Sequence, residues 1–246
     1  MSEADWLLGP NAVEAQLDSD PTRLLEVVVE DGKRNARVEA LVERARKLGI
    51  AVQRHARAVL DKRAGSDRHQ GLIARWRPPE ALDENDLLRL IEHSAEPPLL
   101  LVLDGVQDPH NLGACIRTAA AAGAHAVVVP KDRAVGLTPT AMRASAGMAA
   151  RLPLVRVTNL ARALEKLKKA GVWIGGAAGE ASDSLYSADL KGPLAIVMGS
   201  EGEGLRELTR KTCDYLWKIP IATGVESLNV SVAAGVFLFE ARRQRG

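Results

Sequence analysis

Three segments of the C-terminal half carry glycines and small polar side chains, each close after an apolar run. They are residues 104–113, which contain Asn111 and lead to Arg117, the glycine-rich residues 198–205, and residues 219–231. Glycines let the backbone approach a ligand closely, and amide and hydroxyl groups can bind and orient it. If the three segments meet, they form a compact site of hydrogen-bond donors and acceptors.

Arg117 is the side chain in these segments that is hardest to explain by folding alone. It lies among Ala, Cys and Ile in a predicted helix over 112–122, where a charge is costly unless it has a partner. A guanidinium at this position suits an RNA phosphate, or a carboxylate that holds it for one. The sequence therefore predicts a partnered cation here.

Each segment also has a purely structural interpretation. Asn111 could cap its helix, and Ser227 or Asn229 could cap the last helix of the chain. The glycine-rich segment could be a flexible turn, although a turn does not explain Glu201 among glycines after a buried strand. Capping is the stronger explanation for Asn111 alone, whereas three such segments at neighbouring strand ends favour a site.

Other sequence features exclude several classes of protein. The dinucleotide fingerprint G-x-G-x-x-G and the P-loop motif are absent, which argues against an oxidoreductase and an NTPase. Cys115 and Cys213 form neither a disulfide framework nor a metal-ligand spacing, so we expect no metal. No apolar run approaches the roughly 20 residues of a membrane span. The acidic residues 1–5 are unlike a signal peptide, so we expect a cytoplasmic protein.

Apolar runs and helical patterns alternate from residue 99 onward. We expect strands at 99–103, 126–129, 154–157, 172–174, 194–198 and 216–219, and helices at 112–122, 140–149, 160–170, 204–211 and 229–242. Continuous apolar strands are typical of strands buried on both faces. The alternation predicts an α/β fold with a parallel sheet between helices, which binds ligands at the carboxyl ends of its strands.

The first 76 residues indicate a separate small α/β unit. We expect strands at 24–29, 50–52 and 71–74 and a helix at 38–48. Proline pairs at 78–79 and 97–98 bracket an acidic stretch with a helical pattern, which marks a linker. We therefore expect one domain over 1–76, a linker over 77–98, and a second domain over 99–246, which carries the three motif segments.

Basic charge is concentrated in one early stretch. Residues 1–32 carry eight acids and one arginine, a net of −7, whereas residues 33–77 carry thirteen Lys or Arg against four acids, a net of +9. Such a stretch could meet a phosphate backbone, or it could be a solvated helix face that is rich in arginine. The charge alone supports both interpretations equally.

The three segments resemble, in order and spacing, the motifs of the TrmH-type branch of the SPOUT RNA ribose methyltransferases. The matching patterns are N-x-G-x-x-x-R at 111–117, M-G-x-E-G-x-G at 198–204 and I-P-x-x-x-x-x-x-S-L-N-V-S at 219–231. The N-terminal unit, with Val13, the strand near Val28 and H-Q-G-L-I-A at 69–74, looks like the substrate-binding domain of bacterial 23S rRNA guanosine 2′-O-methyltransferases. Asn11 departs from that pattern, since a histidine is frequent there.

The resemblance implies a C-terminal trefoil knot and a homodimer with its active site at the interface. It implies methylation of a guanosine ribose 2′-hydroxyl in 23S rRNA, in the P loop of the peptidyl-transferase centre. The cofactor would be S-adenosyl-L-methionine, bound bent in the knot by the following residues: Met198, Gly199, Ser200, Gly202, Ile219, Ile221 and Leu228. The catalytic residues would be Asn111, Arg117, Glu201, Ser227 and Asn229.

For the reaction, we expect Arg117 with Asn111 to stabilise the developing alkoxide and Glu201 to orient Arg117. Ser227 and Asn229 would position ribose and cofactor. Arginine acts as the base in one proposal for this family, but guanidinium groups stay protonated in proteins. His110 is a rival base, although a loop histidine is more often a surface residue. Two alternative functions are the same ribose methylation on a tRNA and RNA binding without catalysis.

Overall fold

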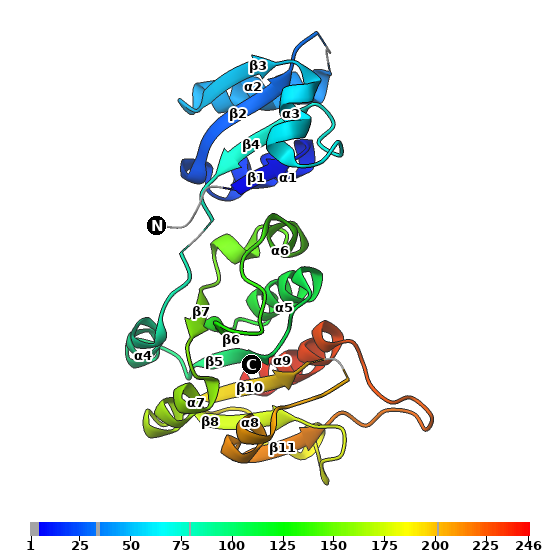
Figure 1. The fold of residues 1–246 in the computed structure, drawn as a ribbon. Helices are drawn as coiled ribbons and strands as arrows, with labels where there is room; N and C mark the ends of the chain where they lie inside the picture. The colour runs from blue at the N-terminus through cyan, green and yellow to red at the C-terminus, as the bar shows by residue number, and fades with distance from the viewer. Residues whose placement is uncertain (1–4, 33–34, 79, 201) are drawn as a thin grey trace.

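The protein consists of two units, an N-terminal one of residues 5–78 and a larger C-terminal one of residues 80–246 (Figure 1). The structure is a computed structural model that describes residues 5–32, 35–78, 80–200 and 202–246. The units adjoin where the first strand lies near helix α6 (Pro139–Ala144). No helix among the described residues is long and apolar enough to cross a membrane.

The N-terminal unit is built on a four-stranded sheet in the order β1-β4-β2-β3. Its strands and helices are β1 (Asp5–Leu8), α1 (Pro10–Ser19), β2 (Leu24–Glu30), α2 (Ala36–Lys47), β3 (Ala51–His55), α3 (Arg57–Ala64) and β4 (Leu72–Trp76). Only β2 and β3 pair in parallel. Helices α1 and α2 cover one face of the sheet, and α3 covers the other through Leu60, which packs on Val28 and Ile73.

Three of these elements are not predicted by the sequence patterns, namely β1, α1 and α3. The strand has only four residues, and α3 buries a single side chain, Leu60, so its sequence shows no apolar stripe. Helix α1 starts at Pro10 after a glycine, which is a helix start signal, but its buried set includes the polar Gln16. Because their amphipathic patterns are weak, these three of the seven helices and strands given above could not be recognised in the sequence.

The acidic start of the chain lies against the basic stretch that follows it. Arg37 pairs with Glu14 and Arg44 with Asp18, both linking α2 to α1. Further pairs join Arg54 to Glu39, Arg57 to Glu30, and both Arg63 and Arg75 to Glu26. Exposed pairs of this kind contribute only about 0–1 kcal/mol, so these arginines stay available to phosphates. Residues 1–77 together carry a net charge of only +2.

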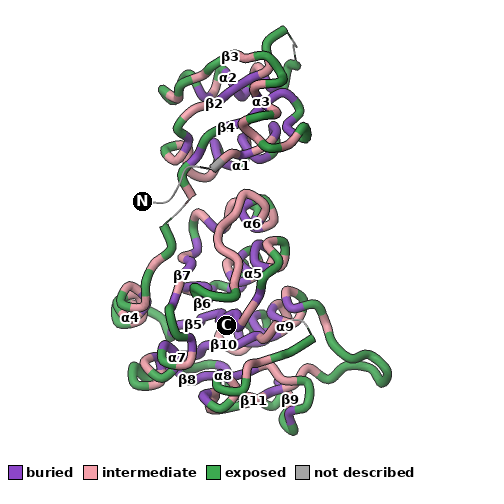
Figure 2. The backbone as a smooth tube through the Cα atoms, viewed as in Figure 1, coloured by how far each residue is buried: buried purple, intermediate pink, exposed green. Residues whose placement is uncertain are grey.

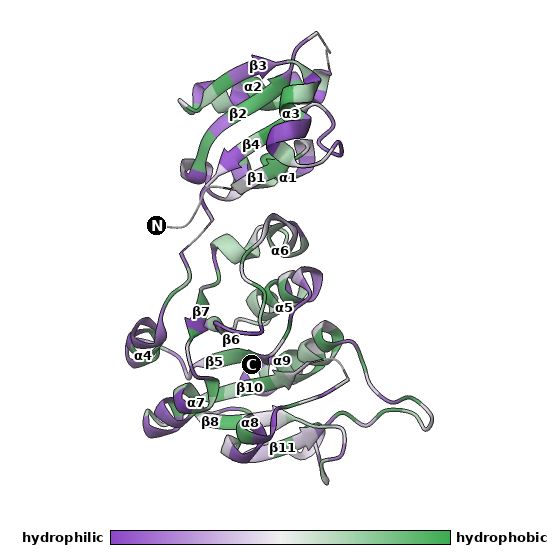
Figure 3. Cartoon of the chain, in the orientation of Figure 1, coloured by the Kyte–Doolittle hydropathy of each residue, from purple (hydrophilic) through white to green (hydrophobic). Residues whose placement is uncertain are grey.

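The C-terminal unit contains a seven-stranded sheet in the order β7-β6-β5-β10-β8-β11-β9, in which all neighbouring strands pair in parallel. The strands are β5 (Leu99–Asp104), β6 (Ala126–Pro130), β7 (Leu154–Val157), β8 (Trp173–Ala177), β9 (Asp183–Ser184), β10 (Leu194–Gly199) and β11 (Tyr215–Lys218). Residues 99–103 of β5 and 194–198 of β10 are hydrophobic (Figure 3) and buried (Figure 2). The predicted parallel sheet is confirmed.

Helices cover both faces of this sheet, as predicted. Helices α5 (Pro109–Ala121) and α9 (Val230–Arg245) pack on the face of Leu101 and Ile196. Helix α7 (Leu160–Lys169) packs on the face of Leu100 and Val197, and the short α8 (Glu207–Thr212) contacts α7. The carboxyl ends of the strands are left to loops, which is where the three motif segments lie.

The acidic stretch predicted as part of a linker forms helix α4 (Glu84–Glu92), capped by Asp83 and Asp86. Leu87 is buried in the core beneath α7, and Leu82 pairs with Val155 of β7. This part of the stretch therefore packs on the C-terminal unit.

One predicted helix is shorter than expected. Instead of a helix over 140–149, α6 ends at Ala144 and a 3-10 turn follows at Met148–Ala150. Ala146 and Gly147 between them have left-handed backbones, with φ of 50° and 81°. The glycine makes this break possible, because it adopts positive φ without strain.

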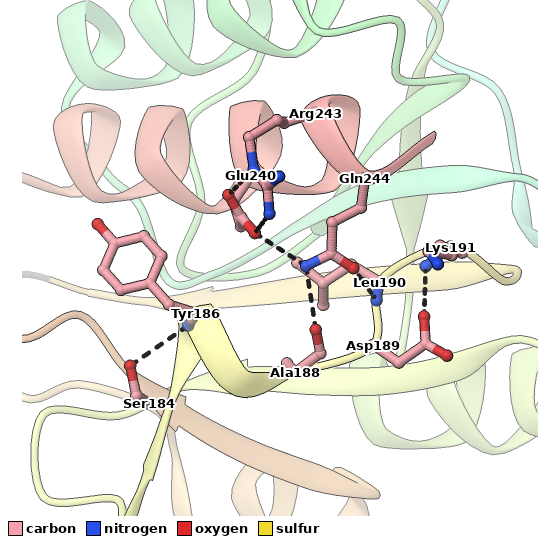
Figure 4. A network of polar contacts seen from close by, with 9 residues as sticks. All are labelled: Ser184, Tyr186, Ala188, Asp189, Leu190, Lys191, Glu240, Arg243 and Gln244. Atoms are coloured by element: carbon pink, nitrogen blue, oxygen red, sulfur yellow. Dashed lines mark hydrogen bonds and ion pairs between the residues drawn. The ribbon is translucent and has the colours of Figure 1, made fainter. Parts of the chain in front are cut away.

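The C-terminal half of α9 is fastened to the segment after β9 by a polar network (Figure 4). The Gln244 amide donates to Ala188 O (3.0 Å) and to Glu240 (2.9 Å), and accepts from Leu190 N (2.9 Å). Arg243 binds both carboxylate oxygens of Glu240 at 2.7 and 2.8 Å. These hydrogen bonds hold the pKa of Glu240 at about 2, well below its ordinary value of 4.5, although burial acts in the opposite direction.

Because this pKa is lowered in the folded state, Glu240 stabilises the fold above pH 4.5, and the stabilisation is lost as pH falls towards 2. We expect Glu240→Gln to lower the free energy of unfolding at pH 7 by about 1 kcal/mol, since Arg243 is solvent-exposed. Urea unfolding at several pH values should show this difference shrinking between pH 4.5 and 2. Glu207→Gln, which breaks an exposed pair with Lys211, is the control. A difference that stays constant with pH would contradict the assignment.

Candidate active site

A cleft of about 300 Å³ opens at the carboxyl ends of β8, β10 and β11. Its walls come from residues 177–179, from the glycine loop after β10, and from the loop between β11 and α9. Most of this last loop is exposed (Figure 2). All seven residues predicted to bind the cofactor line it: Met198, Gly199, Ser200, Gly202, Ile219, Ile221 and Leu228. The structure thus brings together two of the three motif segments.

Trp217 also lines this cleft, and sequence reasoning did not find it. Its ring stacks on Tyr215, with centroids 5.4 Å apart, and lies over Gly175 of β8. A Cβ at Gly175 would lie only 2.0 Å from the Trp217 ring, so this strand position requires glycine. A glycine pair directly after the strand predicted at 172–174, Gly175-Gly176, signals such a close approach and could have pointed to this wall.

The glycine loop after β10 closes on itself. Ser200 N donates to Gly204 O (3.1 Å), and Gly204 N donates to Ser200 O (3.0 Å). A Cβ at Gly199 would lie 2.1 Å from the carbonyl carbon of Gly204, which leaves no space for any side chain. The two hydrogen bonds between Ser200 and Gly204 therefore hold the ends of the loop together beside the cleft.

A buried ion pair attaches the far end of this loop to the sheet. Asp104, at the end of β5, has a fully buried carboxylate. It accepts from the backbone N of Arg206 (3.0 Å) and from the Arg206 guanidinium (Nε, 2.5 Å). A buried carboxylate with three donors from one residue fixes the position of the chain there, because losing the partner would leave a charge buried alone.

Asn111 and Asn229 meet although they lie far apart in the sequence. The Asn229 amide donates to Asn111 Oδ1 at 2.9 Å. Asn229 also caps α9, since its Oδ1 accepts from Ser231 N (2.9 Å) and Oγ (2.6 Å). Asn111 is not the cap of its helix, contrary to the structural interpretation above, because Asp108 takes that role by accepting from His110 N. The first motif segment thus joins the third.

Arg117 is placed differently from what the sequence suggests. It is exposed on the surface of α5, makes no hydrogen bond or ion pair with the described residues, and lines neither this cleft nor its neighbour. The sequence predicts a partnered cation, but Cys115 and Ile116 face the core while Arg117 projects from a different side into solvent, with no partner among the described residues. Ser227 lines the cleft and is exposed, and Glu201 lies outside the described residues.

Gly113 of the first motif has a structural explanation. A Cβ there would lie 2.4 Å from the carbonyl oxygen of Ala141 and 2.5 Å from the Cβ of Ala144, both on α6. Glycine therefore allows α5 and α6 to pack closely. That contact fixes the helix that carries Asn111 at its start.

The thiols of the chain are unsuited to the chemistry of this site. Burial raises the pKa of Cys115 to about 12, and burial together with Asp214 and Asp104 raises that of Cys213 to about 12. Both are therefore protonated at neutral pH, and a thiolate is needed for nucleophilic attack or metal binding. The polar groups that line the cleft are instead backbone groups, the hydroxyls of Ser200 and Ser227, and the charged residues Lys218 and Glu226.

The cleft fits a ligand with apolar and polar parts. Trp217, Leu228 and Phe237 supply apolar walls, and the tight loop at Gly199 supplies backbone donors and acceptors. A sulfonium nucleoside such as S-adenosylmethionine has this mixed character. The predicted cofactor residues are therefore compatible with the predicted cofactor.

Comparison with known proteins bears on both units. Residues 98–239 match the SpoU rRNA methylase family, and residues 6–82 match the family described as RNA 2′-O ribose methyltransferase substrate binding. The 23S rRNA (guanosine-2′-O-)-methyltransferase RlmB of Photobacterium profundum is 56% identical over 241 residues, covering 98% of each chain. RlmB of Vibrio cholerae is 53% identical, covering 98% of this chain and 97% of the relative.

A solved structure of similar fold is the AdoMet-bound rRNA methyltransferase from Sinorhizobium meliloti. It is 26% identical with a TM-score of 0.77, and the alignment covers 98% of this chain and 87% of that one. The order of strands and helices described above therefore extends to both units of a solved protein. The predicted fold class, a small α/β unit followed by a parallel-sheet SPOUT unit, is confirmed.

Proposed function

The chain belongs to the SpoU rRNA methylase family, and on this premise we propose that it methylates the ribose 2′-hydroxyl of a guanosine in 23S rRNA. The observation that carries the proposal is the meeting of the three motif segments at one edge of the sheet, in a chain 56% identical to an RlmB over nearly its whole length. The P loop of the peptidyl-transferase centre is the site we propose within that RNA.

The cofactor is S-adenosylmethionine, which supplies an electrophilic methyl group when bound. Gly199, Ser200 and Gly202 would hold it through their backbone, and Ile219 and Leu228 through apolar contact, with Met198 and Ile221 completing the walls. Fixed positioning of both reactants can contribute roughly 7–11 kcal/mol to lowering the barrier. The closed shape of the Ser200–Gly204 turn supports this role.

A role of the Asn111–Asn229 pair with the ribose is supported by sequence neighbours of Asn229, since Ser227, Leu228 and Val230 line the cleft. We propose that these amides and the Ser227 hydroxyl orient the 2′-hydroxyl. Arg117 would bind phosphate and stabilise the negative charge that develops on the oxygen. Glu201 would orient Arg117, and water or phosphate would receive the proton.

The exposed position of Arg117 is best explained by a homodimer, which we propose on two grounds. Arg117 lies outside its own cleft on the surface of α5, and α9, which packs on α5, exposes the large apolar side chains Val232 and Phe239. A second copy covering this surface would bring its own polar groups to Arg117. In this proposal the active site is completed at the interface.

We propose that residues 1–76 bind the RNA, residues 77–98 connect the units and residues 99–246 carry out catalysis, in the cytoplasm. The exposed arginines of α2, β3 and α3 support an RNA-binding role, because weak surface pairs exchange readily for phosphate contacts. The match of residues 6–82 to a substrate-binding family supports the same role.

The decisive experiment offers the purified protein two RNAs that lack ribose methylation, a 23S rRNA transcript and bulk tRNA. We expect methyl transfer from labelled S-adenosylmethionine to a single guanosine of the 23S transcript, mapped by primer extension at low nucleotide concentration. Methylation of tRNA in preference to the rRNA would identify the alternative substrate. Cofactor binding without transfer to either RNA would favour a non-catalytic RNA-binding protein.

A further inference from the structure

A second cleft, of about 340 Å³, opens beside the cofactor cleft at the carboxyl ends of β5 and β6. Ser200 and Val230 line both clefts, so the two share a wall. Asn111 lines the second cleft, and its partner Asn229 directly precedes the shared Val230. A ligand in the second cleft would therefore lie next to the proposed position of the ribose.

The charged side chains of this cleft fall into two groups. Asp104 and Arg206 bind each other and are satisfied. Asp108, Glu203 and Arg133 remain at the opening, and all three are exposed. One oxygen of Asp108 accepts from His110 N, which leaves the other oxygen available.

Glu203 and Arg133 have no hydrogen bond or ion pair with any residue in the described part of the chain. The backbone of Arg133 is also unusual, since its φ of 57° lies in the left-handed region. Non-glycine residues rarely adopt this region, and such strained positions cluster at functional sites. The opening of the cleft thus presents two carboxylates and one guanidinium, and the one side-chain contact described for them is the cap hydrogen bond of Asp108.

We propose that this cleft binds the guanine base of the methylated nucleotide, an inference that rests on the proposed function. Guanine has N–H donors at N1 and at its 2-amino group, which match the carboxylates of Asp108 and Glu203. Its O6 and N7 are acceptors, the usual partners of an arginine such as Arg133. Adenine has an acceptor at N1, which the carboxylates would repel, and it lacks the 2-amino group.

The position of the cleft agrees with this assignment. Proteins that modify or read single-stranded RNA commonly unstack the base that they bind. In this protein the unstacked base would enter the second cleft. Its ribose would then lie at the boundary formed by Asn111 and Val230, facing the methyl donor in the first cleft. Base recognition would in this way place the 2′-hydroxyl for the reaction.

The test uses the full-length protein and a 23S rRNA transcript whose methylated guanosine has first been mapped. Replacing that guanosine by inosine removes only the 2-amino group. For the wild type we expect kcat/KM to fall about 5-fold to 150-fold, the range for losing one well-formed set of base contacts. The double variant Asp108→Asn/Glu203→Ala should be slower on guanosine and should no longer distinguish the two RNAs.

The variants are chosen to keep the fold. Asn is as good a helix cap as Asp, so Asp108→Asn preserves the start of α5. Arg133→Ala should lower kcat/KM equally for the guanosine and the inosine RNA, because O6 and N7 are present in both bases. Glu207→Ala, which removes an exposed carboxylate of α8 outside the cleft, should keep the full discrimination. Unchanged affinity for S-adenosylmethionine would show that each variant is folded.

Equal methylation of the guanosine and inosine RNAs by the wild type would overturn the base site. The base site would also be overturned if the double variant distinguished the guanosine RNA from the inosine RNA as strongly as the wild type does. If the wild type methylates no guanosine of 23S rRNA, the proposed function fails, and the base assignment fails with it. The two failures are therefore distinguished by whether the unmodified transcript is methylated.

Discussion

Gly199→Ala should weaken the binding of S-adenosylmethionine by about 100-fold. The added Cβ would lie 2.1 Å from the carbonyl carbon of Gly204, 2.3 Å from its oxygen and 2.4 Å from Leu205 N. All three atoms belong to the backbone, so no side chain can rotate out of the way. Overpacking of this kind costs about 1–3 kcal/mol or more, and every 1.4 kcal/mol is tenfold in affinity.

Isothermal titration calorimetry measures this loss directly, and quenching of Trp217, which lines the cleft, offers a second readout. Gly179→Ala is the matched control, because Gly179 lines the same cleft and its Cβ would meet nothing within 4 Å. We expect Gly179→Ala to bind within about twofold of wild type. Equal affinities of the two variants would show that the shape of the Ser200–Gly204 turn does not control binding.

Arg117→Ala should lower kcat by at least about 100-fold, the usual consequence of removing a donor that stabilises an oxyanion. Its affinity for S-adenosylmethionine should be unchanged, because Arg117 does not line the cofactor cleft. The free energy of unfolding of the protomer should change by less than about 0.5 kcal/mol, as at other exposed positions without contacts. Single-turnover methylation, calorimetry and urea unfolding measure the three quantities separately.

Arg162→Ala is the control for this experiment. Arg162 is an exposed arginine of α7 on the opposite face of the sheet, paired only loosely with Glu84 at 3.8 Å. The Arg162→Ala variant should methylate the RNA at the wild-type rate. If Arg117→Ala also retained full activity, Arg117 would have no part in the mechanism, and the exposed surface of α5 would lose its proposed role.

The sequence predicts the C-terminal sheet well because its strands are unusually easy to recognise. β5 and β10 are continuous apolar runs, which only a sheet covered on both faces can bury. The cofactor cleft could be predicted for a similar reason. Parallel strands end at one edge, which places the motif segments near one another, and the family resemblance implies that Gly199, Ile219 and Leu228 hold the cofactor.

Other features could not be predicted, because they depend on which elements become neighbours. The exposure of Arg117 depends on how far around α5 the packing of α6 and α9 extends, and the apolar neighbours Cys115 and Ile116 do not reveal this. The second cleft depends on Arg133, which follows a different strand from Asp108. Glu203 has no periodic pattern around it that would assign it to one cleft rather than the other.

The position of β10 between β5 and β8 has a consequence for synthesis of the chain on the ribosome. β5 pairs on one side with β6, which is synthesised soon after it. Its neighbour on the other side is β10, which is complete only when residue 199 has been added. At about 5–20 residues per second, the apolar edge of β5 stays unpaired for roughly 5–20 s. Unpaired strand edges promote aggregation, because their free backbone groups can pair with another chain. The nascent protein should therefore depend on chaperones during this interval, whereas the N-terminal unit can already be folded.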